Sequence, residues 1–155
     1  TLCKNVYERQ QKANELRTLL EKELAKAHIE AKFTWDIGAT ENEMQEALLL
    51  IRQAQWRWDF GVSSHGGSFH APQETMRILG HGLNKVFQAR MLISKVLVAH
   101  GYTDNVPLPD ITTKEKAQQY IGLDMAVEKA DKDKFLKEIV PEWLQKAKAN
   151  GRIVN

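Results

Sequence analysis

The segment Gln53-Ala54-Gln55-Trp56-Arg57-Trp58-Asp59-Phe60, followed by Ser64-His65-Gly66-Gly67-Ser68-Phe69-His70-Ala71-Pro72, joins two amphipathic stretches of the sequence. It contains two of the four tryptophans and two of the five histidines. Aromatic residues here lead into a glycine-containing turn, where the backbone is free to hold an imidazole outside a regular helix. A simple connection between helices needs no such residues, so this segment is the first candidate for function.

The sequence before this segment predicts two helices. The first covers about residues 5–32, because apolar residues recur there at spacings of three, four and seven: Val6, Ala13, Leu16, Leu20, Leu24, Ala27 and Ala31. A capping box at Thr40-Glu41-Asn42-Glu43 predicts a second helix from Glu41 to about Val62. The short connection between them predicts antiparallel packing.

The sequence after the segment predicts a third long helix. Pro72 suits its first turn and Gly101 suits its C-terminal stop, so it runs to about Ala99 or His100. Apolar residues cover two sides of this helix, which predicts that it is sandwiched between neighbours or buried in an oligomer.

Shorter elements follow. Two prolines keep residues 102–112 extended. A second capping box, from Thr112 to Glu115, opens a short helix that Gly122 ends, and Asp124 caps a last helix that reaches Ala149 with a bend near Pro141. The Glu-rich faces of the first and last helices are interpreted as solvated surface. No strand pattern occurs, so the predicted fold is all-α: one domain over residues 1–155, an elongated bundle of long antiparallel helices with short C-terminal helices.

Composition excludes several classes of protein. The 155 residues are 43% hydrophobic and 27% charged, which is typical of a globular domain. The net charge of +2, with Lys and Glu alternating along helical faces, predicts no nucleic-acid partner. No apolar run approaches the roughly 18–20 residues of a membrane span. Cys3 is the only cysteine, so the chain has no internal disulfide and no Cys-x-x-Cys-His motif for attaching haem c.

Several segments of the chain together resemble the C-terminal part of the ammonia-forming, pentahaem cytochrome c nitrite reductase: residues 27–32, 38–41, 53–59, 64–66, 70–72, 109–111, 113–119, 121–123 and 150–151. The resemblance covers nearly the whole chain. It implies a C-terminal fragment of a periplasmic enzyme that reduces nitrite to ammonia with six electrons carried through five haems. It also implies that the haem c attachment motifs, the catalytic residues and the calcium site of that family lie before Thr1, so that this fragment alone is inactive.

The same resemblance supplies partners. It implies contact with the rest of the parent chain and its haems, a homodimer built on the long C-terminal helices, and a redox partner that is a cytochrome or a quinol dehydrogenase. The chain would wall in haem and bring the haems of two protomers close together.

His70 is the main candidate site residue. The resemblance implies that the histidine before Ala-Pro is a distal axial ligand of a haem iron, and a neutral imidazole nitrogen suits that role. His65 is a second cofactor-binding candidate, with a hydrogen bond or a haem propionate contact set against a structural loop role. Trp56 is expected to pack on a porphyrin edge and Arg57 to pair with a propionate; the alternative for both is an ordinary aromatic core with a surface ion pair.

Two readings without covalent haem remain open from the residues alone. One is a haem-free structural or dimerisation module, and the other is a sensor that binds haem noncovalently. The remaining histidines stand at helical spacing without a partner motif and are interpreted as structural or interface residues: His28, His81 and His100.

Overall fold

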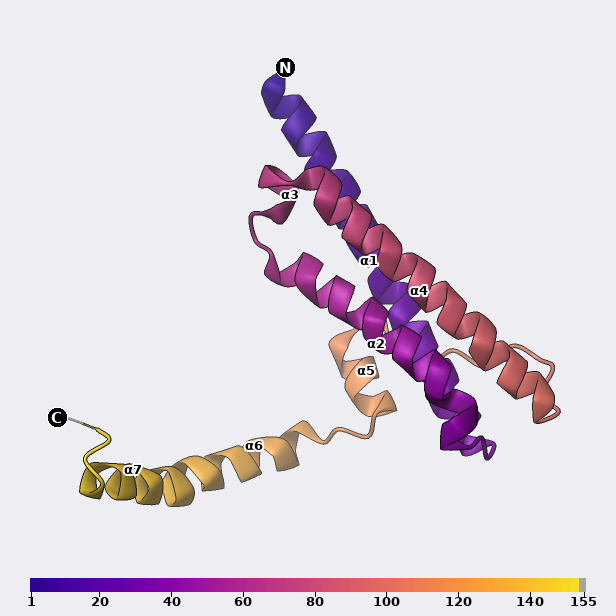
Figure 1. The fold of residues 1–155 in the computed structure, drawn as a ribbon. Coiled ribbons are helices and arrows are strands. Elements are labelled where there is room, and N and C mark those ends of the chain that lie inside the picture. Colours follow the sequence, from indigo (N-terminus) through magenta and orange to yellow (C-terminus); the bar gives the residue numbers. More distant parts are fainter. Residues whose placement is uncertain (154–155) are drawn as a thin grey trace. The chain divides into compact units, whose positions relative to one another are not determined.

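A computed structural model describes residues 1–153 and confirms the predicted all-α class, because these residues form helices and no strand (Figure 1). The chain forms two compact units, residues 1–108 and residues 109–155. Within residues 1–153, each helix is too short or too polar to cross a lipid bilayer.

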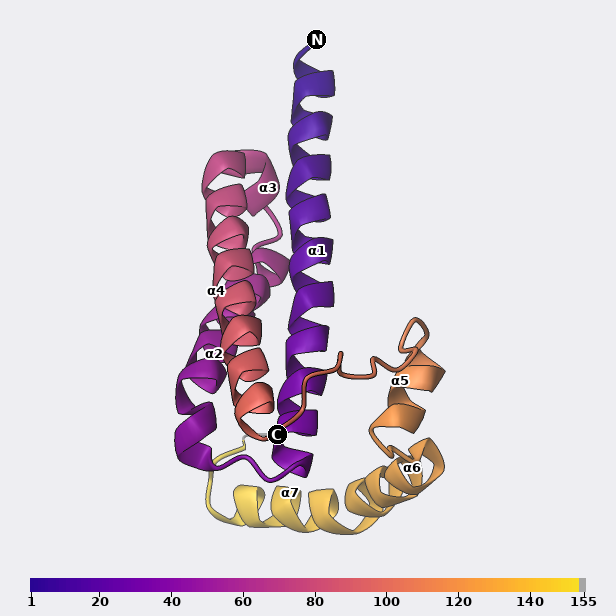
Figure 2. The same cartoon turned by 90° about the vertical axis from the view of Figure 1, so that its right-hand side faces the viewer.

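The first unit is a bundle of three long helices. α1 spans Leu2–Asp36, α2 spans Glu41–Ser63 and α4 spans Pro72–Ala99. Two views show them side by side, with α2 antiparallel to α1 and to α4 (Figures 1 and 2). A short helix, α3, spans Gly67–His70 and connects α2 to α4. The sequence predicted this connection as a loop, because a single helical turn is too short to show periodicity.

The predicted helix starts are present. Thr40 caps α2: its hydroxyl accepts from the Glu43 amide at 3.4 Å, and the Glu43 carboxylate accepts from the Thr40 amide at 2.7 Å. Gly38 supplies the positive φ of 98° that turns the chain between α1 and α2. Pro72 stands in the first turn of α4, where a missing N–H leaves no hydrogen bond broken.

The α2 cap makes stability depend on pH. Hydrogen bonds from Thr40, followed by a contact with His100, lower the pKa of Glu43 to about 2 from its ordinary 4.5. A carboxyl whose pKa is depressed by folding adds stability above its unfolded pKa and loses it as pH falls through the folded value. We therefore expect the difference in unfolding free energy between the wild type and Glu43→Gln to shrink as pH falls from about 4.5 to about 2. Urea titrations at a series of pH values measure it, and a difference that is flat down to pH 2 would contradict the assignment.

The core of the first unit contains aliphatic and small residues from all three long helices. They are Leu20, Leu24, Ala27 and Ala31 of α1, Met44, Ala47, Leu50, Ile51 and Ala54 of α2, Leu79, Leu83, Val86, Ala89, Ile93 and Leu97 of α4, and Ala39 of the connection. Each fully buried large side chain contributes roughly 1.5–3 kcal/mol. Alanines on all three helices, with Gly82 of α4, let the helix axes approach closely. The prediction that α4 is sandwiched between neighbours is confirmed, since it packs on both α1 and α2.

One interaction in this bundle departs from the predicted solvated glutamate face of α1. Arg90 of α4 binds Glu30 through two parallel hydrogen bonds of 2.8 and 2.6 Å and also binds Glu23. Lys26 adds a 2.6 Å contact to Glu23. The Glu23 and Glu30 side chains are only 8% and 13% exposed, so this part of the glutamate face lies inside the bundle.

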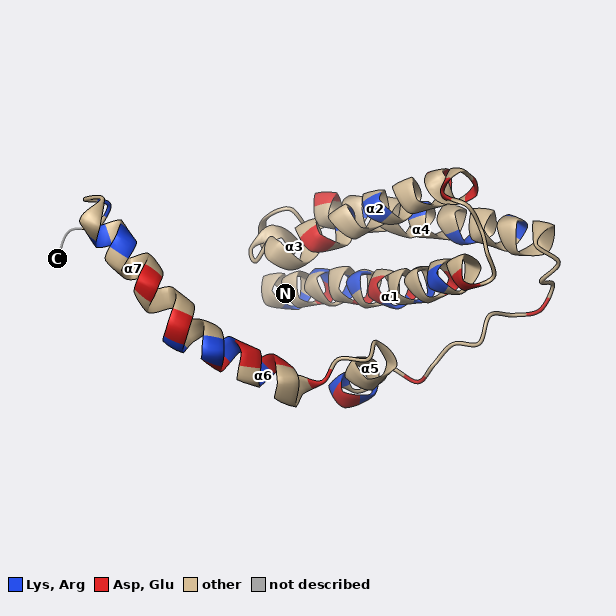
Figure 3. Cartoon of the chain, turned by 90° about the horizontal axis from the view of Figure 1, so that it is seen from below, with Lys and Arg blue, Asp and Glu red and all other residues tan. Residues whose placement is uncertain are grey.

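The second unit consists of smaller helices. α5 spans Lys114–Tyr120, α6 spans Met125–Lys134, a π-helical turn η1 spans Phe135–Ile139 and α7 spans Val140–Ala149. Thr113, one residue later than predicted, caps α5 by accepting from the Lys116 amide, and Asp124 caps α6 as predicted. Acidic and basic residues alternate along α6, whereas α7 has Glu142 in its first turn and Lys146 and Lys148 in its last (Figure 3).

Where the sequence predicted a bend near Pro141, the structure has the π-helical turn η1 just before this proline. Proline has no N–H for the carbonyl four residues earlier, and its ring displaces that carbonyl, so the turn before it widens. Phe135 and Trp143 meet across this turn edge to face, with ring centroids 5.4 Å apart. No residue of the second unit that the structure describes is buried.

Candidate functional site

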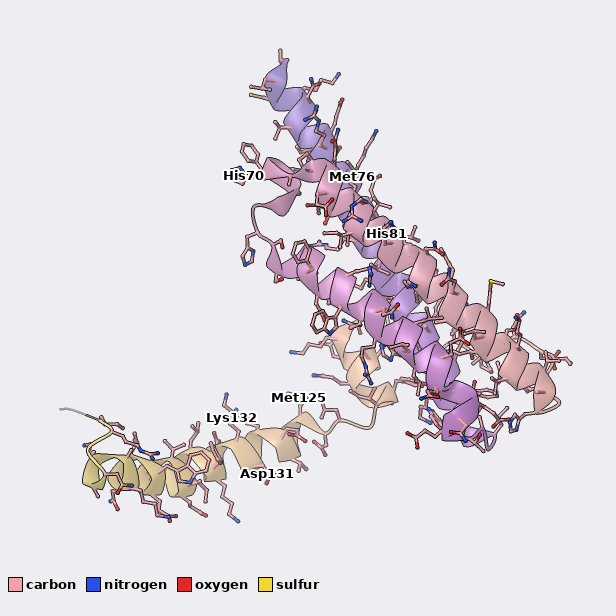
Figure 4. The ribbon with its side chains drawn as sticks, viewed as in Figure 1. His70, Met76, His81, Met125, Asp131 and Lys132 are labelled. Carbon is pink, nitrogen blue, oxygen red and sulfur yellow. The ribbon has the colours of Figure 1, made fainter. Side chains whose placement is uncertain are left out.

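His70 is the last residue of α3, and its imidazole points away from the bundle (Figure 4). Two local features set its direction. The backbone N–H of His70 donates to the Gly66 carbonyl at 2.8 Å, and the ring stands edge to face against Phe69 with centroids 4.9 Å apart. A Cβ at position 66 would lie 2.9 Å from His70 Cδ2, so glycine at 66 gives the ring its space.

Both nitrogens of the His70 ring are available to a ligand. The side chain is exposed, and within residues 1–153 its ring nitrogens make no hydrogen bond or ion pair. The four-residue α3 and the proline-started α4 hold the backbone on both sides of it. The local structure therefore presents an oriented imidazole at the surface, which is the geometry that an axial ligand requires.

His65 lies in the turn between α2 and α3, and its side chain is exposed. Its backbone N–H donates to the Ser63 carbonyl at 3.0 Å. The structure shows no contact between the His65 and His70 rings. The two histidines that the sequence placed close together therefore stand as separate groups.

Trp56 and Arg57 line a different feature, a groove of about 300 Å³ between α2 and α4. Trp56 is 75% exposed, and Phe60, one turn later, is 49% exposed. Arg57 is half-buried, and its Nη1 donates to the Gln53 carbonyl at 2.6 Å. The aromatic pair is therefore surface and not core, while neither loop histidine lines the groove.

The opposite wall of the groove carries residues to which the sequence analysis gave no binding role. Arg77, Ile78 and His81 of α4 face Trp56 and Arg57 across it (Figure 4 labels His81). Arg77 binds Glu74 through hydrogen bonds of 2.7 and 2.5 Å, which lowers the pKa of Glu74 and raises that of Arg77. Arg77 Nη1 also lies 3.4 Å from His81 Nδ1. The available signal was the four-residue spacing of Arg77 and His81, which puts both on one helix face.

The other histidines lie elsewhere. His28 is exposed on α1. His100 follows α4 and contacts Glu43 at 3.1 Å, which is the structural role that the sequence predicted. Among residues 1–153, no group of three or more histidine, cysteine, aspartate or glutamate side chains is arranged to hold a metal ion.

Comparisons with known proteins identify a family and several relatives of this chain. A family described as cytochrome c552 matches residues 1–151. A cytochrome c-552 of Bacteroides fragilis is 74% identical and one of Bacteroides thetaiotaomicron is 71% identical, each over 153 residues. A cytochrome c-552 of Porphyromonas gingivalis is 63% identical over the same length. These matches include 99% of this chain and 31% of each relative, so the chain spans about a third of the length of the curated relatives it matches.

These findings correct the family inferred from the sequence. The matching family and the relatives carry the name of a cytochrome c552, and neither name states nitrite reduction. The assignments as ammonia-forming nitrite reductase, as part of an enzyme and as a C-terminal fragment of that enzyme are therefore replaced by this family. The family is one of c-type cytochromes by name, which implies haem c, whereas the comparisons give no support for calcium.

Proposed function

Because the chain belongs to the cytochrome c552 family, we propose that it takes part in electron transport as a helical unit that covers haem c and supplies His70 to the iron. The observation that carries this proposal is the exposed, oriented His70 imidazole, whose nitrogens have no partner within residues 1–153.

The described residues fit haem c. An exposed imidazole on a fixed turn suits the iron, and the exposed rings of Trp56 and Phe60 offer apolar surface. Arg57 provides a guanidinium group for a propionate, which guanidinium binds through parallel hydrogen bonds, whereas Arg77 is already bound to Glu74. With Cys3 as the only cysteine, the chain has no pair of cysteines for two thioether bonds. The haem would therefore be attached to residues outside these 155.

Haem c, when bound, supplies a one-electron redox couple. The residues of this chain would ligate the iron, cover the porphyrin and balance its charge. His70 would hold a nitrogen in place at the iron. In the separate groove between α2 and α4, Trp56 would offer apolar surface to a haem edge and Arg57 would balance negative charge there. His65 would make a polar contact at the haem edge. A positive charge near a redox group favours its reduced form, so we infer that Arg57 raises the reduction potential.

Partners and location form part of the same proposal. A helix face with exposed Phe87, Met91 and Val98 on α4 supports a homodimer, since large exposed apolar side chains on one helix face are typical of interfaces. Haem c supports a periplasmic location. We propose the remainder of a longer polypeptide with its haems as the nearest partner, and a cytochrome or a quinol dehydrogenase as the electron donor.

A haem peptide tests the role of His70. A c-type haem octapeptide, whose iron carries one histidine and one exchangeable position, is titrated with the 155-residue chain. We expect saturable conversion to the low-spin visible spectrum of bis-histidine haem. In His70→Ala the affinity is expected to fall at least about tenfold, while His65→Ala stays within about twofold. The two variants remove the same group five residues apart, so they separate ligation from a general effect on the loop. Low-spin conversion that survives in His70→Ala would overturn the ligand assignment, and no conversion by the wild type would favour a haem-free structural module.

A further inference from the structure

A polar cavity of about 70 Å³ lies behind the turn that carries His70. Residues of α1, the end of α2, α3 and the start of α4 line it, and it is partly open to solvent. The polar side chains that line it are Gln10, Asn14, Arg17, Ser68 and Thr75. A single water needs roughly 10–15 Å³ of such space, so the cavity has room for a small ion.

Arg17 is the decisive residue in this cavity. Its Nε is buried and has no hydrogen-bond partner, and within residues 1–153 no carboxylate lies at ion-pair distance from its guanidinium. Other partly buried arginines of the bundle have partners: Arg90 binds two carboxylates and Arg57 a carbonyl. A buried donor without an acceptor costs about 1–3 kcal/mol, and more on a charged group, so Arg17 requires a ligand that accepts hydrogen bonds.

The residues that line the cavity favour a negatively charged ligand. None of its lining residues is acidic. Gln10 and Asn14 offer amide N–H groups and Ser68 offers a hydroxyl, while the Thr75 hydroxyl donates to the Ala71 carbonyl at 3.0 Å. A guanidinium surrounded by neutral donors favours an anion over water, because charge-assisted hydrogen bonds are about twice as strong as neutral ones.

We propose that this cavity is a binding site for one compact anion, chloride or a small carboxylate such as formate, held by Arg17. The volume of about 70 Å³ favours compact anions over bulky ones. The site is separate from the proposed haem contacts, since its lining contains none of His70, Trp56 and Arg57.

The position of the site connects it to the candidate haem ligand. Ser68 lines the cavity and lies in α3, two residues before His70. α3 is already close to α4 there, because a Cβ at Gly67 would lie 3.0 Å from Thr75 Oγ1. An anion bound by both Arg17 and Ser68 would link α3 to α1, in addition to the contact of α3 with α4. Occupancy would thus stabilise the turn that orients the imidazole.

Nuclear magnetic resonance of the ¹⁵N-labelled chain tests the site directly. Sodium chloride and, separately, sodium formate are titrated at constant ionic strength against a bulky sulfonate salt. The signals followed are the Arg17 Nε–H and the Ser68 backbone amide. We expect both signals to shift to a plateau with either small anion.

Two substitutions with equal charge change supply the comparison. In Arg17→Gln the affinity read from Ser68 is expected to fall at least about tenfold, whereas Arg9→Gln, at an exposed position two turns earlier on α1, stays within about twofold. If Arg17→Gln does not fold, Arg17→Lys serves in its place. Lysine keeps the positive charge but lacks the planar set of guanidinium N–H donors, so anion affinity is again expected to fall. Shifts that grow without a plateau and equally for all anions would show that water fills the cavity, and a retained Ser68 plateau in Arg17→Gln would also overturn the proposal.

Discussion

Replacing Arg90 with alanine is expected to lower the free energy of unfolding by about 3–5 kcal/mol, the usual cost of removing one member of a buried ionic group. Arg90 is 27% exposed on its side chain and binds two carboxylates that are 8% and 13% exposed. The carboxylates of Glu30 and Glu23 raise the pKa of Arg90, so the guanidinium is always charged. Without it, Glu23 and Glu30, two turns apart on α1, would lose their shared counter-charge, and Lys26 would remain bound to Glu23.

Urea titrations measure this loss against a matched control. Arg77 also forms a double hydrogen bond with a glutamate, but its pair is exposed and screened by solvent, so Arg77→Ala is expected to cost much less than Arg90→Ala. Adding Glu23→Gln and Glu30→Gln to Arg90→Ala should recover part of the stability, because neutral amides need no counter-charge. Equal losses for Arg90→Ala and Arg77→Ala would show that the buried network contributes no more than a surface pair.

Leu20→Ala is expected to destabilise the bundle by about 2–5 kcal/mol, and Gly82→Ala to reverse part of that loss. Leu20 is fully buried on α1, where its Cδ2 occupies the space beside Gly82 of α4. A Cβ on residue 82 would lie 2.6 Å from this atom, so Gly82→Ala alone is expected to cost about 1–3 kcal/mol through overpacking. In Leu20→Ala the obstructing atom is absent, and the new methyl fills part of the cavity.

In a double-mutant cycle, the effect of Gly82→Ala on the free energy of unfolding is expected to change sign between the wild type and Leu20→Ala. In the Leu20→Ala background the next obstacle is Arg57 Cβ at 3.3 Å, which is tight but not prohibitive. Alanine also favours helix over glycine by about 0.8–1 kcal/mol. Gly82→Ala should therefore destabilise the wild type and stabilise Leu20→Ala when both are measured by urea unfolding. Additive effects of the two substitutions would mean that these side chains do not share the same space.

The helices of this protein could be predicted with good accuracy from local patterns. The start of α2 at Glu41 and the start of α4 at Pro72 match the prediction, because capping residues and proline act within a few residues. α1 extends beyond the predicted range to Leu2–Asp36, since helix ends without a strong cap leave little signal. α3 and the π-helical turn are each too short for periodicity to reveal.

The candidate site was predictable only in part. His70, His65, Trp56 and Arg57 attracted attention by their residue types. Sequence spacing could not show that Trp56 and Arg57 share a groove with Arg77 and His81, because those residues come from α4, about twenty positions away. For the same reason the partnerless Nε of Arg17 has no sequence signal: a lysine or arginine on a polar helix face looks solvated until its neighbours are known.

The sequence by itself determined the all-α class, the order of the long helices and the turn that presents His70, because helix periodicity, caps and prolines depend on neighbours a few positions apart. Only the tertiary structure decided that Glu23 and Glu30 lie inside the bundle against Arg90, that Trp56 stays at the surface, and that a cationic cavity lies beneath α3. Burial and charge pairing are set by which helix faces meet, and that choice depends on residues far apart in the chain.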